Sequence, residues 1–189
     1  MSLEQILTPR IVELGKIKIG QLDAQVRTSK TGNAWRAPQK LDHFIVTTMM
    51  RDPAGDLVAD EAVLAKLVEE GYADPDGQLR QLPIALLSDD IADVMSARWC
   101  WYPGRQLGAY SDDGQKIVWK LDAKTRAPLA APRVTEWFDG AADFGFKKHT
   151  IFSCVLAAGQ ARFGGVYKFR TTSAITADQL YGGLLHIQT

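Results

Sequence analysis

The sequence has few cysteines, no long hydrophobic run and no secretion signal. Cys100 and Cys154 are the two cysteines among 189 residues, too few for a disulfide framework, and neither belongs to a CxxC pair. Both are expected to be buried free thiols. No apolar run approaches the roughly 20 residues of a membrane span, and the N-terminus lacks a basic segment followed by an apolar one. We therefore predict a cytoplasmic protein without a membrane contact.

Motifs for catalysis and for metal binding are also missing. His43, His149 and His186 each lack a second His or Cys three to five residues away, which is the local spacing of zinc ligands. The chain contains neither GxxxxGKS/T nor GxSxG. Asp113-Gly114 is typical of a hairpin turn, and the later oxygen ligands of a calcium loop do not follow it. We predict that the protein is not an enzyme and uses no metal or cofactor.

Neither sign of charge is in excess, since 22 basic residues balance 22 acidic ones. Residues 1–40 nevertheless have a net charge of +4, residues 51–95 contain three basic and eleven acidic residues, and residues 96–189 have a net charge of +5. This distribution argues against a uniformly basic nucleic-acid binder. It permits a basic face with an acidic lobe turned away from it, and solvated surface charge is the alternative.

Hydrophobic periodicity predicts an α+β fold, with a mixed, mostly antiparallel sheet, two main helices and long loops. With 46% hydrophobic residues the chain is expected to form a single domain over 1–189, either alone or with an acidic helical lobe at 52–95. The clearest expected elements are strands at 16–20, 22–28, 41–49, 79–87, 98–106 and 147–156, a helix from Asp60 to Gly71, a hairpin at 107–121 and a loop at 122–146.

The stretch from Phe163 to Ile187 is predicted to be a strand that runs into a helix at the centre of the fold. Phe169 is expected to be buried on the strand. Gly182 and Gly183 weaken the helix, and close approach to a neighbouring strand is the expected reason for two glycines there.

The first basic segment is the candidate binding site. Lys and Ile alternate over residues 16–20, residues 29–33 have the composition of a turn, and an irregular loop follows that contains Trp35. A tryptophan beside cations can stack on a base while the cations hold phosphate, although a lone tryptophan is as often a plug of the core. The candidate nucleic-acid-binding or partner-binding residues are Lys16, Lys18, Arg27, Lys30, Trp35, Arg36 and Lys40.

Several short motifs along the chain resemble those of phage recombination directionality factor-like proteins. Residues 16–48 are similar to the opening signature of that family, a strand, a glycine turn, a proline and a Leu-Asp-x-Phe strand, at Ile17, Ile19, Gly20, Gly32, Pro38, Leu41, Asp42 and Phe44. Trp101-Tyr102 with Gly104 resembles its aromatic–glycine segment, and FGGVYKFRTTS resembles its final strand.

The resemblance implies a protein that switches a serine integrase from integration to excision by binding it. Many members have cysteines that look like a small zinc site. This chain departs from that pattern, because Tyr110, Asp112, Asp113 and Lys147 stand where those cysteines would be expected. Relatives also continue with another strand beyond the position of Thr189, so this chain is expected either to be a short relative or to stop early.

Three functions remain open from the sequence. The first is a non-enzymatic phage or prophage recombination accessory protein, whose partner is a site-specific recombinase or integrase, with single- or double-stranded DNA as a further partner. The second is a single-stranded nucleic-acid-binding module that uses residues 16–40. The third, a hydrolase or metalloprotein, is disfavoured by the missing ligands.

Overall fold

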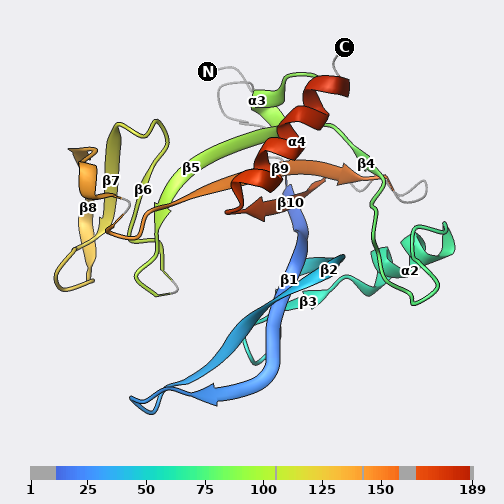
Figure 1. The fold of residues 1–189 in the computed structure, drawn as a ribbon, viewed down its shortest axis with the longest axis horizontal. Coiled ribbons are helices and arrows are strands. Elements are labelled where there is room, and N and C mark those ends of the chain that lie inside the picture. Colours follow the sequence, from blue (N-terminus) through green and yellow to red (C-terminus); the bar gives the residue numbers. More distant parts are fainter. Residues whose placement is uncertain (1–11, 105, 142, 158–164, 188–189) are drawn as a thin grey trace, which may run out of the picture. The chain divides into compact units, whose positions relative to one another are not determined.

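A computed structural model describes residues 12–104, 106–141, 143–157 and 165–187, and strands dominate it (Figure 1). The described residues form ten strands: β1 (Val12–Thr28), β2 (Ala34–Arg51), β3 (Leu57–Ala59), β4 (Ile84–Ala85), β5 (Met95–Trp101), β6 (Ala109–Ser111), β7 (Lys116–Leu121), β8 (Pro128–Glu136), β9 (Lys147–Leu156) and β10 (Gly165–Thr171). The helices among them are α2 (Glu61–Glu69), α3 (Ile91–Val94), α4 (Ala174–Ile187) and the 3-10 turn η1 (Asp139–Ala141). The predicted α+β class is therefore wrong, because the structure is mostly β.

Contacts divide the chain into two compact units, the first from Met1–Leu87 and Ser153–Phe169 and the second from Ser88–Phe152 and Arg170–Thr189. The residues of the acidic stretch 52–95 are consequently shared between the units. No described helix has the length and apolarity needed to span a membrane.

In the first unit the strand order is β3-β2-β1-β10, and the end of β9 follows β10 and also pairs with β4. β1 runs parallel to β10 and antiparallel to β2. The close packing of β1 requires glycine at position 15, because a Cβ there would lie 1.7 Å from the Thr47 carbonyl oxygen. Phe169 is buried, as predicted, with 7% of its surface exposed.

A partly buried polar contact joins α2 to this sheet. Asp60 is the N-cap of α2 and accepts a hydrogen bond from the Val63 amide, so the predicted helix start is confirmed. The other carboxylate oxygen of Asp60 accepts a hydrogen bond of 2.8 Å from the Tyr167 hydroxyl on β10. Burial, followed by this bond, raises the pKa of Tyr167. The contact holds α2 against β10 through side chains 107 residues apart.

The hairpin of β1 and β2 is longer than the sequence indicates. The turn at Ser29–Asn33 is confirmed, with Gly32 at φ 81°. The predicted irregular loop around Trp35 and Pro38 is wrong, because both residues belong to β2, where they pair with Arg27 and Leu22. Proline is tolerated in this strand because residues 34–40 of β2 pair on one side, with β1, and leave the other edge open.

In the second unit the strand order is the start of β9, then β5-β6-β7-β8. One sheet face covers an aromatic core in which Trp101 and Phe146 are buried and Trp99, Trp119 and Trp137 pack around them. The ring centroids of Trp101 and Trp119 lie 5.6 Å apart, and those of Trp137 and Phe146 lie 5.4 Å apart. The predicted hairpin around Asp113-Gly114 is confirmed as β6 and β7, with Gly114 at φ 71°.

Two further expectations for the second unit are wrong. Residues 122–146 are not a loop, because β8 lies within them as an edge strand with two prolines and eight of its nine residues exposed. The close approach expected at Gly182 and Gly183 is not found, since a Cβ at either position of α4 meets no atom of the described residues within 4 Å.

Candidate functional site

All seven predicted binding residues lie on β1, on β2 or in the turn between them, in the first unit. We call residues 20–40 the hairpin arm, because the residues of β1 that pair with β10 end at Ile17 and those of β2 that pair with β3 begin at Thr47. Within the ladders that the structure describes, the arm is therefore a two-stranded ribbon (Figure 1). Lys16 and Lys18 lie at its base, and the other five residues lie on it.

Lys16 and Lys18 are only partly exposed. Ile17, between them, is buried with 5% exposure, so both lysines lie on the opposite face of β1. Lys16 is flanked by Thr47 on β2 and by Lys168 on β10. These two lysines belong to the central part of the sheet and not to the arm.

Trp35 and Arg27 are neighbours on one face of the arm. They are directly opposite in the ladder, and the Arg27 guanidinium lies 5.6 Å from the centroid of the Trp35 ring. Asp23 forms an ion pair of 3.4 Å with Arg27. Trp35 is 46% exposed, so it is not a plug of the core. A cation above an exposed indole forms a compact, partly pre-ordered contact site.

Arg36 lies on the other face and has an internal role. Its guanidinium pairs with Asp56 and donates hydrogen bonds to the carbonyl oxygens of Asp23 and Leu22. Those carbonyls lie where β1 has an irregularity between Leu22 and Val26. Arg36 thus fixes the shape of the arm, and much of its charge is compensated within the first unit.

Lys30 and Lys40 complete the predicted set. Lys30 lies in the exposed turn, and Lys40 is exposed on β2, where alternation places it on the face of Arg36. The structure therefore brings Arg27 and Trp35 together and places Arg36 and Lys40 on the opposite face. Sequence reasoning missed the exposed apolar side chains of Leu22 and Val26, 38% and 61% exposed, which pair with Pro38 and Arg36 and so lie on the face opposite Trp35.

Asp42, on β2 beyond the arm, belongs to a separate ionic network. Its carboxylate lies 2.8 Å from Arg80, which also binds Asp74 at 2.7 Å. Hydrogen bonds from His43 first and from Arg80 second lower the pKa of Asp42. Asp42 is therefore engaged with residues outside the arm.

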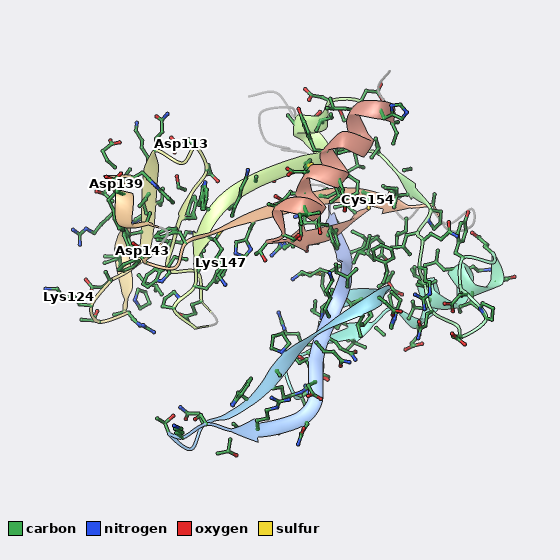
Figure 2. The ribbon with its side chains drawn as sticks, viewed as in Figure 1. Asp113, Lys124, Asp139, Asp143, Lys147 and Cys154 are labelled. Atoms are coloured by element: carbon green, nitrogen blue, oxygen red, sulfur yellow. The ribbon has the colours of Figure 1, made fainter. Side chains whose placement is uncertain are left out.

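The residues at the expected cysteine positions have structural contacts of their own in the second unit, where Asp113 and Lys147 are labelled in Figure 2. Asp113 accepts hydrogen bonds of 2.8 Å from the amides of Gln115 and Lys116, which closes the β6–β7 turn. Asp112 forms an ion pair of 3.0 Å with Arg98. Among the described residues no group of three or more His, Cys, Asp or Glu is arranged to hold a metal ion.

Both cysteines are buried and unbridged. Burial raises the pKa of the Cys154 thiol to about 12, and the thiol lies 3.9 Å from the Tyr167 carbonyl oxygen. Burial also raises the pKa of Cys100. A protonated, enclosed thiol is a poor nucleophile and a poor metal ligand.

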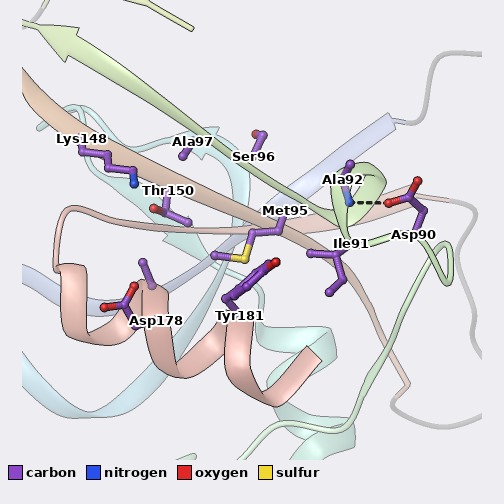
Figure 3. A pocket seen from close by; sticks show the side chains of 11 residues that line it. Asp90, Ile91, Ala92, Met95, Ser96, Ala97, Lys148, Thr150, Asp178 and Tyr181 are labelled. Atoms are coloured by element: carbon purple, nitrogen blue, oxygen red, sulfur yellow. Dashed lines mark hydrogen bonds between the residues drawn. The ribbon is translucent and has the colours of Figure 1, made fainter. Parts of the chain in front are cut away.

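The second unit also contains a groove of about 520 Å³ between α4, α3 and the strands β5 and β9 (Figure 3). Tyr181, Met95 and Ile91 supply its apolar lining, and Lys148 and Asp178 add opposite charges.

Comparison with known proteins gives one family match. The family model described as Gp3-like, recombination directionality factor-like, matches residues 14–189, which is nearly the whole chain. Neither the curated proteins nor the solved structures contain a match. The matched range includes the hairpin arm and the whole second unit.

Proposed function

Because the chain belongs to the Gp3-like, recombination directionality factor-like family, we propose that it is a non-enzymatic phage recombination accessory protein that binds a site-specific recombinase in the cytoplasm. The hairpin arm is the binding element. The observation that carries this proposal is the exposed Trp35 with Arg27 above its ring on a two-stranded ribbon.

The arm has the properties of a recognition element. A two-stranded ribbon has marginal stability by itself, so retaining one of this length favours a role in contact with another molecule. Trp35 exposes apolar surface on one face of the arm, and Val26 and Leu22 expose apolar surface on the other. Tryptophan and arginine are the residues most often responsible for binding energy at protein interfaces. The ion pair and the backbone hydrogen bond of Arg36 hold the ribbon in one shape, which reduces the conformational entropy lost on binding.

Binding to the integrase of the same phage or prophage tests this role. We expect Trp35→Ala to weaken the complex by about 2 kcal/mol or more, roughly thirtyfold, and Arg27→Ala to weaken it by less. Isothermal titration calorimetry measures both. Met50→Ala is the matched control, because Met50 is a 70% exposed apolar residue of β2 outside the arm. Equal affinity of the Trp35 variant and the wild type would refute the proposal.

Single-stranded nucleic-acid binding by the arm is the second candidate, favoured by two exposed cations, Arg27 beside Trp35 and Lys30 in the turn. It predicts that Lys30→Ala weakens oligonucleotide binding and makes its salt dependence shallower by about 0.7 for each phosphate that the variant no longer binds. If the arm binds only a protein, Lys30→Ala changes the affinity for the recombinase and leaves oligonucleotide binding unchanged.

A further inference from the structure

The second unit has exposed cations on the sheet face opposite its aromatic core. Trp99, Trp101 and Trp119 point to the core, so the residues that alternate with them point outward. Ladder pairing aligns Arg98 with His149, and Cys100 with both Lys147 and Tyr110. We call this outward side the basic face. Its exposed or partly exposed members on β5 to β7 and β9, with Tyr102 just after β5, are Arg98, Tyr102, Tyr110, Lys116, Lys120, Lys147 and His149.

Positive charge is concentrated on the basic face. Arg98, Lys116, Lys120 and Lys147 are exposed, and the charges of Lys147 and Arg170 both act on His149, which places Arg170 beside the same residues. Among the acidic residues on this side, Asp112 is paired with Arg98, and Glu136 lies opposite Lys116 in the β7–β8 ladder. The four exposed cations outnumber these two carboxylates, in a protein whose formal net charge is zero.

Aromatic rings lie among these cations. The Tyr102 ring is 44% exposed, and its centroid is 5.4 Å from that of His149. Arg98 and Lys120 lie over the Tyr110 ring, 5.1 Å and 5.7 Å from its centroid. Partial burial and the neighbouring cations lower the pKa of His149, so this ring is neutral near pH 7 and is available as a stacking surface.

We propose that the basic face binds single-stranded DNA, with Lys147, Lys120 and Arg98 on the phosphates and Tyr102 stacked on a base. This surface is distinct from the hairpin arm and belongs to the other unit. Single-strand-binding proteins combine a positively charged track with aromatic side chains on which bases stack, and both components are present here. An acidic protein segment would satisfy the cations but would leave the exposed Tyr102 ring and the partly exposed His149 ring without a flat partner.

Two adjacent lysines of β9 provide a controlled test. Lys147 and Lys148 are both exposed and carry the same charge, but they point to opposite faces, and Lys148 lines the groove beside α4. We expect Lys147→Ala to weaken binding of a fluorescent oligodeoxythymidine and to make the salt slope shallower by about 0.7. Lys148→Ala, at equal net charge, is expected to leave both quantities close to those of the wild type.

Stacking is tested separately. We expect Tyr102→Ala to weaken oligonucleotide binding about tenfold or more without changing the salt slope. Tyr102→Phe retains the ring and is expected to bind as the wild type does. The full chain is used throughout, and circular dichroism verifies the fold of each variant.

Three outcomes would overturn the inference: equal losses in the Lys147 and Lys148 variants, a duplex bound as tightly as the single strand, or no measurable oligonucleotide binding by the wild type. Loss in the variants of Trp35 and Lys30 only would assign DNA binding to the arm. Recombinase binding is measured on the same proteins, and Lys147→Ala is expected to leave it unchanged. Failure of one proposal is thereby distinguished from failure of the other.

Discussion

At the scale of single residues, the sequence shows which cations exist but not which ones are already paired. The sequence predicts Arg36 for the same site as Trp35, yet Arg36 pairs with Asp56, twenty residues away, and with two backbone carbonyls. Adjacent positions in a strand point to opposite faces, so once residues 34–40 are known to be a strand the separation of Trp35 from Arg36 follows. The sequence instead predicts a loop around Pro38, because proline is more typical of turns than of edge strands. In a loop, the placement of Trp35 and Arg36 on opposite faces does not follow.

His149 gives a prediction about pH. Its lowered pKa in the folded state means that the unfolded chain takes up this proton at a higher pH than the folded protein does. Below an ordinary histidine pKa of about 6.5 the unfolded state therefore binds more protons, and the fold loses stability as the pH falls. We expect His149→Gln to lose less stability than the wild type between pH 7 and pH 5. Urea denaturation followed by tryptophan fluorescence measures the difference. An equal loss of stability in both proteins would show that His149 does not cause the loss at low pH.

At the scale of elements, alternation and turn chemistry predicted β9, the Ser29–Asn33 turn and the β6–β7 hairpin. The local sequence did not predict elements whose structure depends on pairing or packing with other elements. β8 contains two prolines and little alternation of apolar residues. It is a strand because its backbone pairs with that of β7. In α4 Leu184 is buried, whereas Ile175 and Ile187 are 72% and 70% exposed. Ser173 precedes the helix, and its hydroxyl accepts a hydrogen bond from the Thr176 amide in the first turn.

The two glycines of α4 give the prediction at this scale. Open space surrounds the position of a Cβ at Gly182 and at Gly183, and neither residue has a positive φ. Alanine should therefore stabilise the helix, by about 1 kcal/mol at each position at most. Gly15→Ala is the contrasting variant, since its methyl group would meet the Thr47 carbonyl oxygen at 1.7 Å, and we expect it to destabilise the protein. Denaturant midpoints at constant slope measure both effects. Destabilisation by Gly182→Ala would show that the glycine has a packing role.

At the scale of the whole molecule, the two units differ in how their cores are built. The core of the first unit is mainly aliphatic, with Val46 and Leu67 fully buried and Ile17 paired with Val46. The second contains four of the five tryptophans, packed with Phe144 and Phe146. The clustering of Trp99, Trp101, Trp119 and Trp137 was not predicted, because it requires β5, β7 and the segment after β8 to meet. The two proposed binding surfaces likewise lie one in each unit, so variants can separate them.

The aromatic core predicts how the second unit responds to loss of packing and to chelation. Phe146 is 4% exposed and contacts three tryptophan rings, at 5.4, 6.1 and 6.4 Å between centroids. Phe146→Ala should lower the free energy of unfolding by about 3–5 kcal/mol, through lost burial and the cavity left behind. Phe138→Ala is the control, because Phe138 is 38% exposed and a smaller loss is expected.

Chelation tests the same core in a second way. Since ring packing holds β5, β7 and the segment after β8 together, we expect EDTA to leave the unfolding midpoint of the wild type unchanged, as followed by fluorescence of the clustered tryptophans. In a domain held by a structural metal, the free energy of metal binding is part of the folding free energy, and a chelator unfolds the protein. A fall of the midpoint in EDTA, with one zinc per chain by elemental analysis, would show that a metal and not the aromatic cluster holds the second unit together.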